Sequence, residues 1–460
     1  MNIIILGAGQ VGSSLAESLV KESDKNEVCI VDQDGERLRK LRDRLDLRAV
    51  EGNAAWPSVL RRAGAEDADL LVAVTNSDEI NMIACHVGHL LFNIPQRLAR
   101  VRATEYLEHE ELFGEGGIPV KLRISPEQLV TRYIQRLIEY PGALQVVDFA
   151  DGKVQMVAVR VYGDGPLVGR EVARLKERLP EGVESRIAVI FRDNKPIFPD
   201  GSTIFRVNDT VYFLAARKDI RHVMAALRKL DNPARRVMLA GGGNIGRILA
   251  SALEKEHYVK VVEQDGERAR RLSSELSNSI VLQGDCADEE LLKDENIDQI
   301  DVFCAVTNDD EANILSAMLA KRLGARRVVA LINRAAYVDL VDGNLVDIAI
   351  SPQQVTLGAL LRHLRRGEVA QLHSLRRGQA EAMEAVAKGT AATSQIIGRT
   401  LEEIKLPDKV TIGGLVRGEQ VLMAHHDLRI EPEDHILLFI ANKEQVPAVE
   451  KLFQAGAAFL

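Results

Sequence analysis

The stretch Gly7-Ala8-Gly9-Gln10-Val11-Gly12 lies between an apolar segment and an amphipathic one. The segment before it, Asn2 to Leu6, ends in four aliphatic residues and predicts a short buried strand. After it, Leu15, Leu19 and Val20 are spaced for one face of a helix. A glycine loop between a strand and a helix is typical of dinucleotide-binding folds, whereas the glycine spacing alone is a weak signal.

The three glycines of this loop have separate expected roles. Gly7 would make the tight turn, Gly9 would let the backbone approach a pyrophosphate, and Gly12 would let helix and strand pack closely. The unpaired N–H groups at the start of the helix would then face that phosphate.

An acidic residue follows where such a fold needs one. A second apolar strand, Val28 to Val31, ends at Asp32, about twenty residues beyond Gly12. A carboxylate at this position can accept both ribose hydroxyls of an adenine nucleotide. It also repels a 2′-phosphate, so NAD is favoured over NADP.

Length and composition set the class of protein. A chain of 460 residues is long enough for roughly two to four domains, and its net charge of −8 argues against a broad nucleic-acid-binding surface. The four cysteines are far apart, so we expect buried, reduced thiols. No apolar run approaches the ~18 residues of a membrane span, and the first residues predict a core strand instead of a signal peptide. We therefore expect a soluble, cytosolic chain.

The opening pattern occurs twice. Gly241-Gly242-Gly243-Asn244-Ile245-Gly246 repeats the glycine loop, and Glu263 corresponds to Asp32. The segment Ala73-Val74-Thr75-Asn76-Ser77-Asp78-Glu79 returns as Ala305-Val306-Thr307-Asn308-Asp309-Asp310-Glu311. These blocks are offset by 231 to 234 residues, so the second half of the chain duplicates the first.

Strands alternate with helices in each half, so the predicted fold class is α/β, with two doubly wound parallel-sheet Rossmann units. A small α+β domain follows each unit, with hairpin turns at Asp151-Gly152 and Arg377-Gly378 and, in the first copy, a helix near 168–178. The expected domains are residues 1–125 and 233–350 (Rossmann units) and 143–228 and 368–453 (small domains), with linkers at Tyr140-Pro141-Gly142, Asp231-Asn232-Pro233 and Arg365-Arg366-Gly367.

The sequence does not show the catalytic groups that a dehydrogenase of this fold would need. A dehydrogenase of this fold needs an acid, a base or a metal near the nicotinamide, but the chain has no Tyr-x-x-x-Lys pair. His86 and His89 are expected to be an exposed or packed pair, His425-His426 is expected to face solvent in a hairpin, and no metal site is expected. Binding without turnover is therefore favoured, and we do not expect an enzyme. An NAD-dependent oxidoreductase and a nucleotide-sensing scaffold for another partner are the alternatives.

The ordered set Gly7-x-Gly9-x-x-Gly12, Asp32, Gly52 and Ala73-Val74-Thr75, followed by a small β-rich domain, resembles the RCK family (regulator of potassium conductance, or KTN). Two such modules in one chain resemble the peripheral subunits of bacterial Trk-type potassium uptake systems, over the whole length. The resemblance implies a cytoplasmic homo-oligomer, a dimer or tetramer forming a gating ring on the inner face of the cell membrane. It implies a Trk-type potassium pore as partner, and NAD(H) and ATP or ADP as ligands.

The family pattern also assigns the nucleotide-contacting residues. The first site would use Gly7, Ala8, Gly9, Gln10, Val11, Gly12, Asp32, Thr75, Asn76 and Arg100, and the second Gly241, Gly242, Gly243, Asn244, Ile245, Gly246, Glu263, Thr307 and Asn308. The two sites are expected to differ, because Arg100 faces Ile332 in the register of the duplication and Asn53 faces Asp285. The second site would then hold a different or less charged nucleotide.

Overall fold

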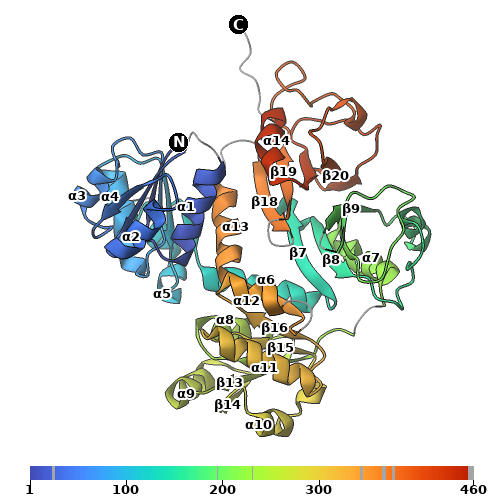
Figure 1. The fold of residues 1–460 in the computed structure, drawn as a ribbon, viewed down its shortest axis with the longest axis horizontal. Helices are drawn as coiled ribbons and strands as arrows, with labels where there is room; N and C mark the ends of the chain where they lie inside the picture. The colour runs from blue at the N-terminus through green and yellow to red at the C-terminus, as the bar shows by residue number, and fades with distance from the viewer. Residues whose placement is uncertain are drawn as a thin grey trace. The chain divides into compact units, whose positions relative to one another are not determined.

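The computed structural model describes residues 1–22, 26–114, 116–193, 195–229, 232–341, 345–364, 369–375 and 379–453. These form two compact units, one of Met1–Arg132 with Arg236–Leu360 and one of Tyr133–Arg235 with Leu361–Leu460 (Figure 1). Each unit therefore combines segments from both halves of the chain. The linker expected at Arg365-Arg366-Gly367, the turn at Arg377-Gly378 and Asp231 of the middle linker lie outside the described residues.

The first Rossmann unit follows the chain in strand–helix order. Its elements are β1 (Asn2–Leu6), α1 (Gln10–Glu22), β2 (Glu27–Asp32), α2 (Gly35–Arg42), β3 (Arg48–Glu51), α3 (Pro57–Arg62), β4 (Leu70–Ala73), α4 (Asp78–Leu90), β5 (Gln96–Arg100), α5 (Thr104–Leu107), the 3₁₀ turn η1 (Glu110–Phe113), β6 (Leu122–Ile124) and α6 (Pro126–Glu139). All six strands are parallel, in the order β3-β2-β1-β4-β5-β6. Helices cover both faces of such a sheet, which is why β4 is buried along its whole length.

The second Rossmann unit repeats this order as β14-β13-β12-β15-β16-β17. Its elements are β12 (Arg236–Ala240), α8 (Asn244–Leu253), β13 (Tyr258–Glu263), α9 (Gly266–Glu275), β14 (Ile280–Gln283), α10 (Glu289–Asp294), η5 (Ile297–Gln299), β15 (Val302–Ala305), α11 (Asp310–Arg322), β16 (Val328–Leu331), α12 (Ala335–Val341), β17 (Ile348–Ile350) and α13 (Pro352–Leu364). The predicted α/β class with two doubly wound parallel sheets is confirmed. In the described parts of the chain, no helix is both long and apolar enough to cross a bilayer.

Each small domain is built on a five-stranded antiparallel sheet, ordered β10-β9-β11-β8-β7 in the first and β18-β19-β22-β20-β21 in the second. The first contains β7 (Ala143–Phe149), η2 (Ala150–Gly152), β8 (Val154–Arg160), η3 (Val172–Arg178), β9 (Ser185–Arg192), β10 (Lys195–Ile197), β11 (Thr210–Ala216), η4 (Arg217–Asp219) and α7 (Ile220–Leu227). The second contains β18 (Val369–Leu375), β19 (Ala380–Val386), η7 (Leu401–Glu403), β20 (Val410–Arg417), β21 (Gln420–Met423), β22 (His435–Ile440), η8 (Lys443–Gln445) and α14 (Val446–Phe453).

The helix expected near 168–178 is wrong in type and extent, because only the 3₁₀ helix η3 forms there. The N–H of Gly169 donates to the carbonyl of Phe205, and the N–H of Val172 donates to that of Thr203. Pairing with this neighbouring segment takes up the donors that an α-helix would need. The helices α6 and α7 were not anticipated from the sequence.

An arginine–aspartate pair recurs in both small domains. Arg192 binds Asp209 through Nε (2.9 Å) and Nη2 (2.8 Å), and Arg417 binds Asp434 with the same two distances. Both aspartate side chains are fully buried. Each follows a residue with positive φ, Asn208 or Glu433, as expected for equivalent turns. A bidentate pair with a buried carboxylate fixes the turn before β11 or β22.

The two small domains share one apolar core within their unit. It joins β7, β8, β9 and β11 to β18, β19, β20 and β22 through side chains that include Phe149, Leu214, Leu375, Ala382 and Phe439. A buried polar contact accompanies it, since the N–H of Ala150 donates to Oε2 of Glu384 at 2.9 Å. Nδ1 of His435 lies 2.5 Å from the other oxygen of this carboxylate.

We predict that Asp434→Ala destabilises the second small domain by about 2–4 kcal/mol, because it leaves Arg417 without its buried partner. Glu431→Ala is the matched control, since Glu431 binds the same guanidinium but its side chain is 55% exposed. Glu431→Ala should lower the free energy of unfolding by less than about 1 kcal/mol. Amide hydrogen exchange of β22 would measure both, and equal effects of the two substitutions would contradict the assignment.

Candidate functional site

The two glycine loops have the same backbone geometry. Gly7 has φ +104° and Gly241 has φ +108°, a conformation that favours glycine. A Cβ at either position would also approach the backbone of the threonine after the central strand, Thr75 or Thr307, to about 3.0 Å. The first glycine of each loop therefore makes the tight turn that the sequence predicts.

The other two glycines differ from each other. A Cβ at Gly9 or Gly243 would meet no atom within 4 Å, so this part of each loop faces open space. A Cβ at Gly12 or Gly246 would lie 1.9 Å from the carbonyl oxygen of the first glycine of its loop. The third glycine thus lets the helix seat on the loop, while the second leaves room where a ligand would approach.

The helices α1 and α8 begin directly after the second glycine of each loop, at Gln10 and Asn244, so Gly12 and Gly246 belong to the first helical turns. The first N–H groups of a helix have no partner within the helix and carry a partial positive charge. In the first loop, the hydroxyl of Ser13 binds the carbonyl of Ala8 at 2.9 Å and steadies this turn. Each loop can therefore hold an anion without any positively charged side chain.

The carboxylates that end β2 and β13 hold the loops from the other side. Asp32 accepts the N–H of Ala8 at 2.5 Å and that of Asp34 at 2.9 Å. Glu263 accepts the N–H of Gly242 at 2.7 Å and that of Asp265 at 2.8 Å. Each carboxylate is thus fixed beside its loop, in the position expected of a ribose acceptor.

The two carboxylates differ in their access to solvent. Asp32 is partly exposed, whereas Glu263 is buried and its Oε1 lies 3.2 Å from Nη1 of Arg268. The corresponding residue of the first half, Arg37, pairs with Asp34 instead. Glu263 therefore has fewer free lone pairs for a ligand than Asp32.

A buried asparagine clamps the strand ends of each sheet. Oδ1 of Asn81 accepts both the N–H (2.9 Å) and the hydroxyl (2.7 Å) of Thr75, and its Nδ2 donates to the carbonyl of Arg100 at 2.9 Å. Asn313 makes the same three bonds, to Thr307 and the carbonyl of Leu331. These asparagines hold Thr75 and Thr307 in place, so they position the site without facing it.

The equivalence assumed for Arg100 is wrong. Because Asn81 binds the carbonyl of Arg100 and Asn313 binds that of Leu331, the structural counterpart of Arg100 is Leu331 and not Ile332. The separation along the chain from Asn313 to Leu331 is 18 residues, one fewer than the 19 from Asn81 to Arg100. The expected difference between the sites stands, since Leu331 is apolar and buried.

Arg100 is poorly solvated for a charged group. Burial lowers the pKa of its guanidinium. The carboxylate of Glu127, whose Oε1 is 3.9 Å from Nη2 of Arg100, raises this pKa but by less than burial lowers it. Its Nε is buried and has no hydrogen-bond partner within the described residues. A guanidinium in this state would be stabilised by a further anion.

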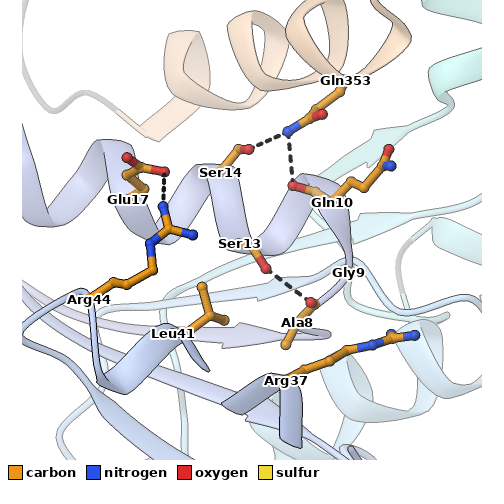
Figure 2. Close-up of a pocket in the computed structure, with 10 residues that line it drawn as sticks. All are labelled: Ala8, Gly9, Gln10, Ser13, Ser14, Glu17, Arg37, Leu41, Arg44 and Gln353. Carbon is orange, nitrogen blue, oxygen red and sulfur yellow. Dashed lines mark hydrogen bonds and ion pairs between the residues drawn. The ribbon is translucent and has the colours of Figure 1, made fainter. Parts of the chain in front are cut away.

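A pocket of about 590 Å³ opens at the first loop (Figure 2). The loop and α1 line one side, and Arg37 and Leu41 of α2 line the other. Gln353 of α13 completes the rim: its Nε2 donates to the carbonyl of Gln10 at 3.2 Å and to the hydroxyl of Ser14. A residue of the second half thus reaches the loop of the first, a contact that no local sequence signal indicates.

Two further acidic residues support the site. Asp78 accepts the N–H groups of Arg102 (2.7 Å) and Ala103 (2.8 Å), and Asp310 accepts those of Asn333 and Arg334, both at 2.8 Å. These bonds fix the segment after β5 and after β16. Both aspartates belong to the repeated Thr-Asn-x-Asp-Glu block, so the duplication was the signal that could have identified them.

The predicted site residues come together in two places. Gly7 to Gly12, Asp32, Thr75, Asn76 and Arg100 lie at the carboxyl ends of β1, β2, β4 and β5, and their counterparts lie at the ends of β12, β13 and β15. The four cysteines are buried and free, as expected. Burial raises the pKa of Cys29 to about 11 and those of Cys85 and Cys304 to about 12, so these thiols stay protonated.

Comparison with known families agrees with this architecture. The TrkA-N domain family matches residues 3–120 and 237–352, and the TrkA-C domain family matches residues 156–228 and 390–454. The fold and the paired loops thus define a tandem RCK-type protein with two Rossmann units.

The chain belongs to the TrkA family of potassium uptake proteins. It is 56% identical to the Trk system potassium uptake protein TrkA of Vibrio alginolyticus, over 100% of both chains. The TrkA proteins of Halomonas elongata and Haemophilus influenzae are 54% and 48% identical, again over 100% of both chains.

Solved structures share the fold. The GsuK RCK domain superposes with a TM-score of 0.62 at 17% identity, covering 98% of this chain and 94% of that one. The GsuK channel bound to NAD gives a TM-score of 0.61 at 16% identity, covering 98% and 78%.

The loop geometry predicts that two glycine-to-alanine substitutions have very different effects on stability. Gly12→Ala places a methyl group against the carbonyl of Gly7 and should lower the stability of the first Rossmann unit by about 3 kcal/mol or more. Gly9→Ala enters open space and should change stability by less than about 1 kcal/mol. Thermal unfolding followed by calorimetry would compare them, and the pair Gly246→Ala and Gly243→Ala should behave likewise. A stable Gly12→Ala protein would show that the loop is not seated as described.

Proposed function

We propose that this chain is a nucleotide-binding regulatory subunit that controls potassium flux through a Trk-type membrane pore without consuming its ligand. The observation that carries the proposal is the repeated arrangement of an open second glycine, a helix N-terminus and a loop-bound carboxylate, Asp32 or Glu263, in a potassium uptake family. Such an arrangement binds a dinucleotide or nucleotide by its phosphates and ribose.

In the first site we assign NAD(H). Its pyrophosphate would lie over Gly9 and the start of α1, and its ribose hydroxyls would bind Asp32. Thr75 and Asn76 would lie beside the phosphates, and Arg100 would pair with one of them. ATP or ADP would use the same loop and ribose contacts, so these nucleotides would compete with NAD(H).

In the second site, formed by Gly241 to Gly246 with Glu263, Thr307 and Asn308, the same contacts are weaker for a charged ligand. Leu331 supplies no positive charge where the first site has Arg100, and Glu263 is buried and held by Arg268. We infer that this site prefers a less charged nucleotide or binds the same one more weakly.

We further propose that the chain acts as a homo-oligomeric ring, a dimer or tetramer, on the cytoplasmic face of the membrane. Exposed apolar side chains support contacts between copies: Leu90 and Leu91 at the end of α4, and Leu315 in α11, are 58–61% exposed. Within each copy, residues 1–125 and 233–350 would bind nucleotide, while 143–228 and 368–453 would transmit the change. A ligand can regulate the pore only if it binds two shapes of the ring with different affinity.

Calorimetric titration of the purified chain with NAD, NADH, ATP and ADP tests the sites. Gly9→Val should abolish binding at the first site and leave the second unchanged, and Gly243→Val should do the reverse. Asp32→Ala should weaken the first site by about 1–3 kcal/mol, since a charged acceptor is lost. Unchanged affinity in Gly9→Val protein that folds normally would rule out the loop as the phosphate site.

Flux through a reconstituted potassium pore tests the regulatory role. Nucleotides that bind the chain should change flux with the same concentration dependence as binding, and chromatography should recover them unaltered. The Gly9→Val and Gly243→Val proteins should lose the response to the corresponding ligand. Consumption of NADH with added substrates would favour the oxidoreductase alternative, and binding without any effect on flux would favour a scaffold.

A further inference from the structure

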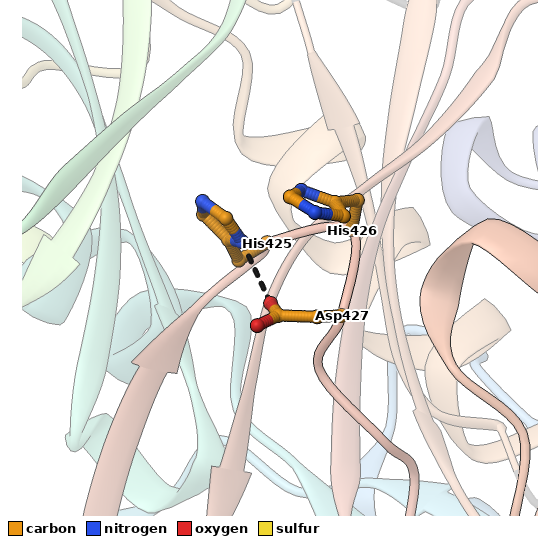
Figure 3. Close-up of side chains that lie close together, drawn as sticks. All are labelled: His425, His426 and Asp427. Carbon is orange, nitrogen blue, oxygen red and sulfur yellow. Dashed lines mark hydrogen bonds and ion pairs between the residues drawn. The ribbon is translucent and has the colours of Figure 1, made fainter.

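We propose that the turn His425-His426-Asp427 of the second small domain is a binding site for a transition-metal dication such as zinc. The three side chains offer two imidazole nitrogens and a carboxylate oxygen, all within 4.8 Å of one another (Figure 3). The turn lies in neither glycine loop, so the inference does not depend on the nucleotide sites.

The backbone of the turn is already fixed. The N–H of Leu428 donates to the carbonyl of His425 at 3.0 Å and closes the turn. The N–H of Glu402 donates to the carbonyl of His426 at 3.2 Å, and the N–H of Leu401 donates to that of Leu428 at 3.0 Å, which ties the turn to η7. A ligand set carried on a fixed turn loses less conformational entropy when it binds an ion.

The side chains are arranged for a cation. Nδ1 of His425 lies 2.7 Å from Oδ1 of Asp427, and the ring centroids of His425 and His426 are 4.4 Å apart. A bound metal would take the place of this hydrogen bond, with one nitrogen from each ring and one oxygen of Asp427 as its protein ligands.

The donor types select the metal. Imidazole nitrogen with carboxylate oxygen suits Zn²⁺, Ni²⁺ or Cu²⁺, whereas Mg²⁺ and Ca²⁺ prefer oxygen ligands alone. Because the three side chains are exposed, the remaining coordination positions are open to water. Such a site binds reversibly and contributes little to folding, unlike a closed structural zinc site.

The duplication provides an internal comparison. In the first small domain the turn Asp200-Gly201-Ser202-Thr203 makes the same three backbone bonds: Thr203 N–H to Asp200 (3.3 Å), Ala173 N–H to Gly201 (3.0 Å) and Val172 N–H to Thr203 (2.8 Å). This copy contains no imidazole, so the turn folds without histidine. The histidine pair of the second copy is therefore not explained by folding, and a metal-binding role accounts for it.

Exchange of the turns tests the site on the full-length, tag-free chain. The triple substitution His425→Asp, His426→Gly, Asp427→Ser copies the first turn into the second domain and should remove one equivalent of bound zinc per chain. The melting temperature without metal should stay the same, because the three backbone bonds remain. The reverse graft, Asp200→His, Gly201→His and Ser202→Asp, should add one equivalent.

Competition with a chromophoric zinc chelator gives the stoichiometry, with Mg²⁺ as the control ion. His425→Ala and Asp427→Asn alone should each weaken zinc binding by tenfold or more, while His89→Ala, an exposed histidine elsewhere, should not. X-ray absorption of the zinc-loaded protein should show imidazole ligands. Equal zinc binding by the wild-type and turn-exchanged proteins would overturn the proposal, as would displacement of zinc by millimolar Mg²⁺.

Discussion

The 1.9 Å that would separate a Cβ at Gly12 from the carbonyl oxygen of Gly7 is the constraint on which the first Rossmann unit depends. Because glycine has no side chain, the first turn of α1 can pack directly against the backbone of the loop. This contact keeps the N-terminus of α1 at the carboxyl end of β1. The same distance at Gly246 seats α8 on the second loop. The bonds from Ala8 N–H to Asp32 and from Gly242 N–H to Glu263 restrain both loops, and a restrained loop loses less conformational entropy when it binds a ligand.

The parts of this arrangement that are local in sequence could be predicted from it. A buried aliphatic run before a glycine loop and an acid after the next strand predict the sheet class and bring Gly9, Asp32 and Thr75 together.

The contacts that depend on packing could not be predicted. Nothing near Asn81 or Gln353 in the sequence shows that one clamps two strands and that the other reaches a loop more than three hundred residues away. The counterpart of Arg100 could not be placed from a constant offset, because the stretch from Asn313 to Leu331 is one residue shorter than the stretch from Asn81 to Arg100. In the first small domain, the 3₁₀ helix η3 forms in place of the expected α-helix because the N–H groups of Gly169 and Val172 pair with the segment at 203–205.

The two halves share their buried hydrogen-bond networks but differ in several other side chains. Asn81 and Asn313, Asp78 and Asp310, and the two buried arginine–aspartate pairs make the same bonds at equivalent positions. The differences lie in side chains outside these networks: the buried Leu331 stands where the first half has Arg100, and the exposed His425 stands where it has Asp200. Replacing a group that satisfies buried polar atoms lowers the free energy of unfolding, whereas replacing an exposed side chain usually changes it little. An exposed position such as His425 can therefore differ between the halves without loss of the fold.

The shared core of the small domains has a consequence for how this protein responds to dilution. Phe149, Leu214, Leu375 and Phe439 belong to one apolar cluster although they come from both halves of a single chain. Two separate copies of a half-length chain would form such a core only above some threshold concentration. Here the covalent link fixes the effective concentration of one domain at the other, so the pairing persists however scarce the protein is. The buried contact of Glu384 with Ala150 then gives this pairing one register, because any slip would leave a carboxylate without its donor.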